Sequence, residues 1–263
     1  MTEQDPLKPV RSILVSQPEP SDVAKAPFYF LEEKYGIKVT YRSFIKVEPV
    51  PAKDFRKNHI DFAEITAGIF TTKFAIDYFF AMCKEMRFVV SQDFKYFCLS
   101  ENIANYLQTY IHMRKRKVFF GERVFSDMKE VLLKHKKKEK FFVPTSNTGT
   151  KGIVDFMTEN NFDFKEGMLY QTVSADLSEF SDITYDMLVF FTPFGIKSLF
   201  ENFPDFKQNE TRIAVFGESA QKAALEAGIK ITIPSSLASF SAEAPAITTA
   251  IEAYVHRANA VIQ

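Results

Sequence analysis

The chain of 263 residues contains only two cysteines and no tryptophan. Cys83 and Cys98 lie in apolar surroundings without CxxC spacing, which predicts buried thiols rather than a disulfide or a reactive centre. The sequence has no run of about 18 apolar residues, and its polar start lacks the apolar core of a signal peptide. We therefore expect a protein of the reducing cytoplasm that neither enters a membrane nor is secreted.

Fingerprints of the common cofactors and nucleophiles are also missing. No GxGxxG follows a predicted strand, and TSNTGTKG at residues 145–152 lacks the GxxxxGK[ST] spacing of a phosphate-binding loop. The histidines are scattered and form no HExxH motif, and no GxSxG elbow occurs. We therefore expect no cofactor and no metal site.

Positive and negative charges balance, because Lys and Arg together number 33 and Asp and Glu also number 33. Nothing global therefore points to nucleic acid or an anionic membrane, and we expect neither as a partner. One local exception is residues 111–140, with eleven Lys or Arg against four Asp or Glu. Such a stretch can bind polyanions or dock a partner, although solvated helix ends and linkers are its commoner role.

Strand and helix patterns alternate along the chain. Residues 12–16 and 37–44 read as strands around a predicted helix over 22–35, which Gly36 ends. The same order returns at 141–144, 149–160 and 167–173, with Val15 matching Val143 and Tyr41 matching Tyr170 at offsets of 128 and 129. Residues 63–80 likewise match 185–203, and 97–111 match 214–229. We therefore predict an α/β protein with parallel sheets, built by duplication of about 120 to 130 residues.

Polar residues follow several predicted strands and open the helices that come next. In parallel sheets such positions gather at the carboxyl edge, where helix starts offer free N–H groups and positive dipole ends. Each residue alone is typical of a helix cap, whereas together they suit a carboxylated or phosphorylated ligand. The residues of this kind include Ser16, Thr71, Thr72, Ser100, Ser146, Asn147, Thr148, Lys151, Thr192 and Ser219.

The sequence resembles the uroporphyrinogen-III synthase family from Ile13 to about Tyr254. The resemblance is carried by ILVSQP, FTTKFAIDYF, VPTSNTGTKGIVDFM, LYQTV, VFFTPFGIKSLFENF and AVFGESAQKAALEAGI, in this order. It implies two α/β domains, each a parallel β-sheet flanked by helices, joined by a two-stranded β-ladder. One domain is then expected over 1–41 and 174–263, the other over 48–165, with linker strands at 42–47 and 166–173. Equivalence of the two halves suggests that 37–44 pairs with 167–173 in this ladder.

The resemblance also implies a function. Members of the family cyclise hydroxymethylbilane to uroporphyrinogen III with loss of water and inversion of ring D, in haem biosynthesis, without a metal or organic cofactor. Their Tyr-x-Thr motif falls on Tyr170 and Thr172, where the phenol would donate a proton to the departing hydroxyl. The substrate carries eight carboxylates, for which the implied contacts are Thr172, Thr71, Thr72, Ser146, Asn147, Thr148, Lys151, Thr192 and Ser219. We expect a monomer.

Three positions depart from the family pattern. Gln17 replaces an arginine, Phe74 replaces an amide, and Ala220 replaces a threonine. These departures motivate a second hypothesis, a non-catalytic two-domain protein that binds a carboxylated or phosphorylated small anion.

Overall fold

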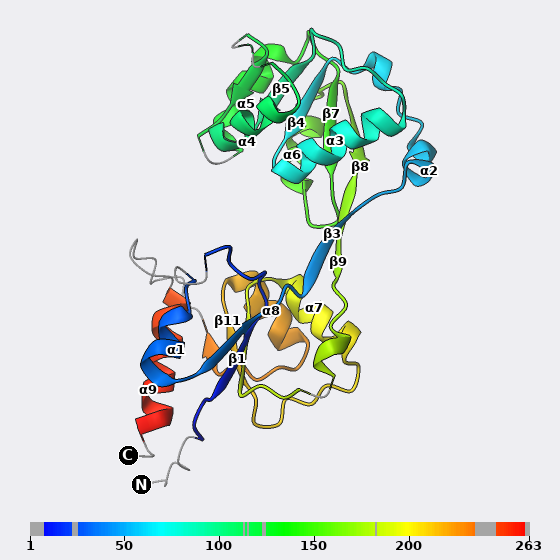
Figure 1. The fold of residues 1–263 in the computed structure, drawn as a ribbon. Helices are drawn as coiled ribbons and strands as arrows, with labels where there is room; N and C mark the ends of the chain where they lie inside the picture. The colour runs from blue at the N-terminus through cyan, green and yellow to red at the C-terminus, as the bar shows by residue number, and fades with distance from the viewer. Residues whose placement is uncertain are drawn as a thin grey trace. The chain divides into compact units, whose positions relative to one another are not determined.

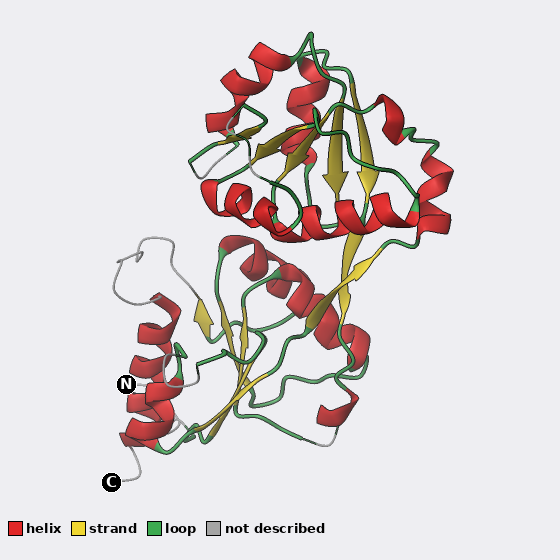
Figure 2. Ribbon diagram, turned by 45° about the horizontal axis from the view of Figure 1, so that its top comes forward, coloured by secondary structure: helices red, strands yellow, loops and turns green. Residues whose placement is uncertain are grey.

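The computed structural model describes residues 8–22, 26–112, 114, 116–122, 125–181, 183–234 and 246–260. The chain divides into two compact units: unit 1 comprises Met1–Lys46 and Val173–Gln263, and unit 2 comprises Val47–Thr172. Each unit is an α/β domain whose parallel sheet is flanked by helices (Figures 1 and 2). Within the described residues, no helix has the length and apolar character needed to cross a membrane.

Unit 1 is a three-layer domain. Its sheet has the order β12-β11-β10-β1-β2, formed by Ile233–Pro234, Arg212–Val215, Met187–Phe190, Ser12–Val15 and Lys38–Tyr41. Helices α1 (Tyr29–Tyr35) and α9 (Ala246–Asn259) pack on one face of this sheet, through Leu31 and Ile251. The other face is covered by α7 (Pro193–Asn202) and α8 (Glu218–Glu226), with Leu199 and Ala224 in its core.

Unit 2 has the same layers. Its sheet has the order β6-β5-β4-β7-β8, formed by Val118–Phe120, Lys95–Cys98, Ala67–Phe70, Phe141–Thr145 and Phe164–Met168. Helices α3 (Lys73–Glu85) and α4 (Glu101–Tyr106) cover one face, whereas α5 (Ser126–His135) and α6 (Lys151–Glu159) cover the other. The short elements outside these layers are α2 (Ala52–Phe55) and the 3-10 turns Arg56–Asn58, Phe62–Glu64, Leu107–Thr109 and, in unit 1, Ser178–Phe180.

The two sheets share one strand order when β1 is matched with β7, β10 with β4 and β11 with β5. These are the segments that the sequence pairs, so the topology agrees with the matches from which the duplication is predicted. The match of Tyr41 with Tyr170 is wrong, because Val15 is opposite Tyr41 whereas Val143 is opposite Glu166. The duplication itself stays a prediction.

A two-stranded ladder joins the units, as the family resemblance implies. It consists of β3 (Ile45–Pro49) and β9 (Tyr170–Ser174). The backbone N–H of Val50 donates to Leu169 and that of Ala175 donates to Phe44, so the two strands run antiparallel. The predicted pairing of 37–44 with 167–173 is wrong, because residues 38–41 form the edge strand β2 of unit 1.

The helix predicted over 22–35 is shorter than expected. Among its described residues, α1 begins only at Tyr29. Pro27 disfavours a helical backbone at the residue before it, which explains the late start. The predicted stop is confirmed, because Gly36 has φ 64°, its N–H donates to the carbonyl of Glu32, and the N–H of Ile37 donates to that of Leu31.

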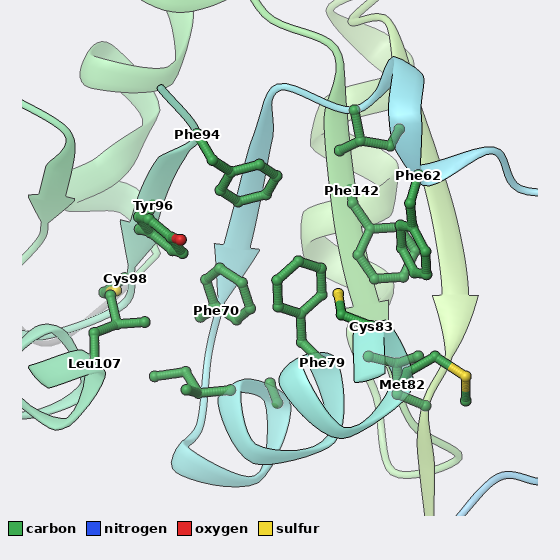
Figure 3. Packing of buried hydrophobic residues seen from close by; sticks show 14 of the residues in the cluster. Phe62, Phe70, Phe79, Met82, Cys83, Phe94, Tyr96, Cys98, Leu107 and Phe142 are labelled. Carbon is green, nitrogen blue, oxygen red and sulfur yellow. The ribbon is translucent and has the colours of Figure 1, made fainter. Parts of the chain in front are cut away.

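The core of unit 2 is built largely from phenylalanine. Figure 3 shows Phe70, Phe79, Phe94 and Phe142 clustered between α3 and one face of the sheet. Phe79 is fully buried, with its ring centroid 5.3 Å from that of Phe70 and 6.0 Å from that of Phe142. Both cysteines lie in this core, as predicted: they are free and buried, and burial raises the pKa of each thiol to about 12.

We predict that Phe79→Ala lowers the free energy of unfolding of unit 2 by about 3 to 5 kcal/mol, because it leaves a cavity among fully buried rings. Phe120→Ala is the matched control: Phe120 lies on edge strand β6 and is 47% exposed, so its loss should change stability by less than about 1 kcal/mol. Urea unfolding measures both values. Equal losses for the two variants would contradict this description of the core.

Candidate functional site

Two hydroxyl groups meet in unit 2 where β4 leads into α3. The side chain of Thr72 caps α3 by accepting a hydrogen bond from Ala75 N at 3.0 Å. The same Oγ1 atom lies 3.1 Å from the phenolic oxygen of Tyr170, at the start of β9. Thr72 therefore connects the start of α3 to β9, and it gives the Tyr170 hydroxyl a fixed hydrogen-bond partner.

Aromatic side chains of α3 hold the Tyr170 ring. Tyr78 stacks on it with centroids 5.3 Å apart and an interplanar angle of 20°, and Phe74 approaches it at 6.3 Å. The hydroxyl of Tyr78 donates to the carbonyl of Val47 on β3. Burial, assisted by Asp77 and Glu48, raises the pKa of Tyr78, so this phenol stays protonated at neutral pH.

The alternation predicted for 167–173 holds only after Leu169, where β8 ends and β9 begins. Tyr170 and Thr172 share one face of β9, and they are only 5% and 8% exposed. The α3 aromatic pair covers the Tyr170 ring.

The loop between β7 and α6 fixes the second residue of the motif. Asn147 Oδ1 accepts from the backbone N–H of Thr172 at 2.8 Å, and Asn147 Nδ2 donates to the Thr172 carbonyl at 2.8 Å. Asn147 thus pairs with β9 as a neighbouring strand would. Both of its polar atoms are bonded to the Thr172 backbone, and these bonds hold β9 in position.

The remaining polar groups of unit 2 lie on the same loop or beside it. The hydroxyls of Ser146 and Thr148 are 2.9 Å apart, and Lys151 is the exposed first residue of α6. Thr71 is half-buried just before Thr72. Strands β4 and β7 are neighbours in parallel pairing, so the loops that follow them leave the sheet at one edge. The structure therefore brings the predicted residues of unit 2 to a common edge.

Thr192 and Ser219 belong to unit 1, and they differ in their setting. Thr192 caps α7 by accepting from Gly195 N at 3.1 Å, as the helix-cap interpretation predicts. Ser219 is the exposed second residue of α8, so it is not the cap of that helix. Neighbouring strands β10 and β11 lead to these positions.

The three departures from the family pattern also have a structural setting. Gln17 is half-buried in the turn after β1, and Ala220 is fully buried in the core beneath α8, where it offers no polar group. Phe74 is 49% exposed on the first turn of α3. Ser100 is also not a side-chain cap, since it makes no capping hydrogen bond.

Sequence reasoning missed Tyr78 as a site residue, because aromatic residues at helical spacing are typical of an ordinary core. The available signal is the spacing of Phe74 and Tyr78, which are four residues apart on the helix that begins after Thr72.

The whole arrangement offers hydroxyl and N–H donors, one lysine and a phenol. It suits binding of carboxylates and delivery of a proton. The described residues contain no cluster of three or more His, Cys, Asp or Glu side chains able to hold a metal ion.

Comparisons with known proteins agree with the fold. The family model HEM4, described as uroporphyrinogen-III synthase HemD, matches residues 30–242. A sequence comparison with curated proteins gave no significant match. The model therefore covers most of both units, including the Thr72 and Tyr170 positions.

Solved structures show the same fold at low sequence identity. The chain is similar to a uroporphyrinogen-III synthetase of Helicobacter pylori, with 16% identity, a TM-score of 0.54 and coverage of 93% of this chain and 98% of the other. It is also similar to a mutant uroporphyrinogen III synthase of Thermus thermophilus, with 12% identity, a TM-score of 0.50 and coverage of 95% and 99%. The fold, the order of the motifs and the extent of the family match lead to one conclusion: this chain belongs to the uroporphyrinogen-III synthase family.

Proposed function

We propose that this protein is a uroporphyrinogen-III synthase, which converts hydroxymethylbilane to uroporphyrinogen III with loss of water and inversion of ring D. The observation that carries the proposal is the family match over residues 30–242, within which a buried tyrosine is held beside a threonine hydroxyl. The alternative of a non-catalytic anion-binding protein is not favoured by this match.

Tyr170 is the proposed catalytic acid. Its proton joins the departing hydroxyl of the substrate, which leaves as water, and the pyrrole nitrogen stabilises the azafulvene that remains. Ring D then attacks through its substituted position to form a spiro intermediate, which reopens and closes with the ring inverted. Closure releases one proton, which restores the phenol, so the net change is the loss of one water. Thr72, which is bonded to Tyr170 and itself exposed, can pass the proton between the phenol and the substrate.

The polar loops are the proposed contacts for the substrate carboxylates. In unit 2, Ser146 and Thr148 lie on the loop that leads into α6, and Lys151 is the first residue of that helix, where backbone N–H groups and the helix dipole favour anions. Thr71 and Thr72 serve in the same way at α3, and Thr172 lies beside Tyr170 on β9. In unit 1, we assign this role to Thr192 and Ser219. The enzyme acts mainly by positioning, because the azafulvene reacts without further activation.

We also propose a cellular location, an oligomeric state and a partner for the protein. Two buried thiols, free of any disulfide, suit a reducing cytoplasm. We further propose that the protein acts as a monomer with hydroxymethylbilane as its partner and without nucleic acid, since its formal charge is zero. Sedimentation at micromolar concentration should give a mass near 30.2 kDa.

The decisive assay supplies freshly made hydroxymethylbilane and separates the product isomers. We expect isomer III to exceed isomer I, because the spontaneous closure that yields isomer I is slower than the enzymatic one. Heat-denatured protein is the control for that background. Formation of isomer I alone in the presence of the folded protein would contradict the proposed activity.

Tyr170→Phe removes one hydroxyl and keeps the ring that Tyr78 stacks on. We predict a kcat about 100-fold lower, at the lower end of general-acid effects, because the hydroxymethyl group is already a reactive leaving group. Tyr106→Phe is a matched control, since it also removes one phenol hydrogen bond, to Asp77, outside the site. Each variant should lose only about 1 kcal/mol of stability. If the Tyr170→Phe variant kept the wild-type kcat, the Tyr170 hydroxyl would have no role in the mechanism.

Asn147→Ala removes both hydrogen bonds that hold the backbone of Thr172. Because we assign Asn147 a positioning role, we predict that kcat falls about tenfold while KM changes less than about threefold. Asn105→Ala is the control, as an exposed asparagine of α4 outside the candidate site. A rise in KM at unchanged kcat would show instead that Asn147 binds the substrate directly.

A further inference from the structure

Unit 2 contains a second concave site. A cavity of about 760 Å³ lies at the C-terminal end of α3, whereas Thr72 lies at the N-terminal start of that helix. The cavity is bounded by the last turn of α3, the loop of residues 86–94 and the first residues of β5 and β6, such as Tyr96 and Val118. Its volume is in the range of small-molecule sites, and it shares no lining residue with the candidate active site.

The interior of this cavity is apolar and uncharged. Phe94 and Tyr96 form part of the wall and lie close together in the core view of Figure 3. Phe80 and Tyr110 add a parallel stack with centroids 4.5 Å apart. Burial raises the pKa of the Cys83 thiol to about 12 and also raises that of Tyr96, so both groups remain neutral at physiological pH. These walls suit a hydrocarbon rather than a sugar or a nucleotide.

The rim of the cavity is cationic. Lys84, Arg87, Arg114 and Lys117 line it, and the described lining residues include no carboxylate. Lys117 bonds to Asp93, which lies outside the lining. In the described part of the chain, no ion pair involves Lys84, Arg87 or Arg114. Three exposed cations therefore stand at the mouth of an apolar cavity.

The negative end of α3 does not cancel this positive rim. The N–H groups of Met86, Arg87 and Phe88 donate to carbonyls of the last turn at 2.8 to 3.1 Å. Arg87 adopts φ 56°, which ends the helix and starts the loop. The helix carbonyls are thus occupied by the chain itself, and the side-chain cations dominate the mouth.

We propose that this cavity binds a long-chain carboxylate, with its hydrocarbon chain along the aromatic wall and its head group at Arg87 and Arg114. The apolar interior excludes highly charged ligands, because burying an unpaired charge there is costly. The cationic mouth favours an anionic head over a neutral or cationic one, since arginine bonds carboxylates in a forked geometry. This site is separate from the proposed synthase site and independent of it.

The absence of tryptophan from the chain allows a direct binding assay. Val89 lines the cavity and is 88% exposed, so Val89→Trp places a single fluorophore at its mouth without disturbing the core. We expect dodecanoate, below its micelle concentration, to shift this emission to the blue. Leu225→Trp in unit 1, where the side chain is 64% exposed, is the matched control and should not respond.

Head-group recognition is tested with two ligands and two pairs of substitutions. Dodecyltrimethylammonium should bind at least tenfold more weakly than dodecanoate. The double variant Arg87→Gln with Arg114→Gln should bind dodecanoate roughly tenfold more weakly than the unmodified protein. Lys134→Gln with Lys137→Gln removes the same charge from unit 2 outside the cavity and should leave binding unchanged. Titration calorimetry on the unmodified protein gives the reference affinity. No binding of dodecanoate, equal binding of the cationic ligand, or unchanged binding in the arginine variant would each overturn the proposal.

Discussion

Parallel strand pairing is the constraint on which the rest of the structure depends. Because neighbouring strands of each sheet run in one direction, every loop that follows a strand leaves at the same edge. In unit 2 this places the Thr72 turn and the Asn147 loop side by side after β4 and β7. Each loop then reaches one residue of the Tyr-x-Thr motif: Thr72 bonds Tyr170, and Asn147 bonds Thr172. The sheet therefore determines where the candidate acid can lie.

The way the acid is held has a consequence for its chemistry. The ring of Tyr170 is buried against Tyr78, while its hydroxyl is directed to the more exposed Thr72. In the mechanism that we propose, the proton therefore leaves from a fixed position, and the phenol itself is not widely open to water. Phe74 replaces the amide of the family pattern and contributes an aromatic contact at this point. At this position the chain therefore packs an aromatic ring against the tyrosine.

Local signals in the sequence predicted the elements that depend on local physics. Gly36 ends α1 because glycine tolerates a left-handed backbone, and Thr192 caps α7 through its own hydroxyl. The pairing of strands that lie far apart in the chain could not be predicted from such local signals. Residues 38–41 and 45–49 are both short strands, and only tertiary contacts decide that the first joins the unit 1 sheet and the second pairs with β9. Family resemblance, rather than periodicity, led to the ladder and to Tyr170. Tyr78 escaped prediction because its stack joins residues far apart in the chain.

The central claim is that unit 2 presents a carboxylate-binding edge around a tyrosine acid. A crystal structure with the product, or its oxidised form, bound at saturation tests this claim most directly. We predict product carboxylates bonded to the Ser146–Thr148 loop and to the α3 start, with the Tyr170 hydroxyl or its Thr72 partner within hydrogen-bond distance of the macrocycle. A product bound elsewhere on unit 2, with the Thr72 and Tyr170 hydroxyls contacting only each other, would contradict the claim.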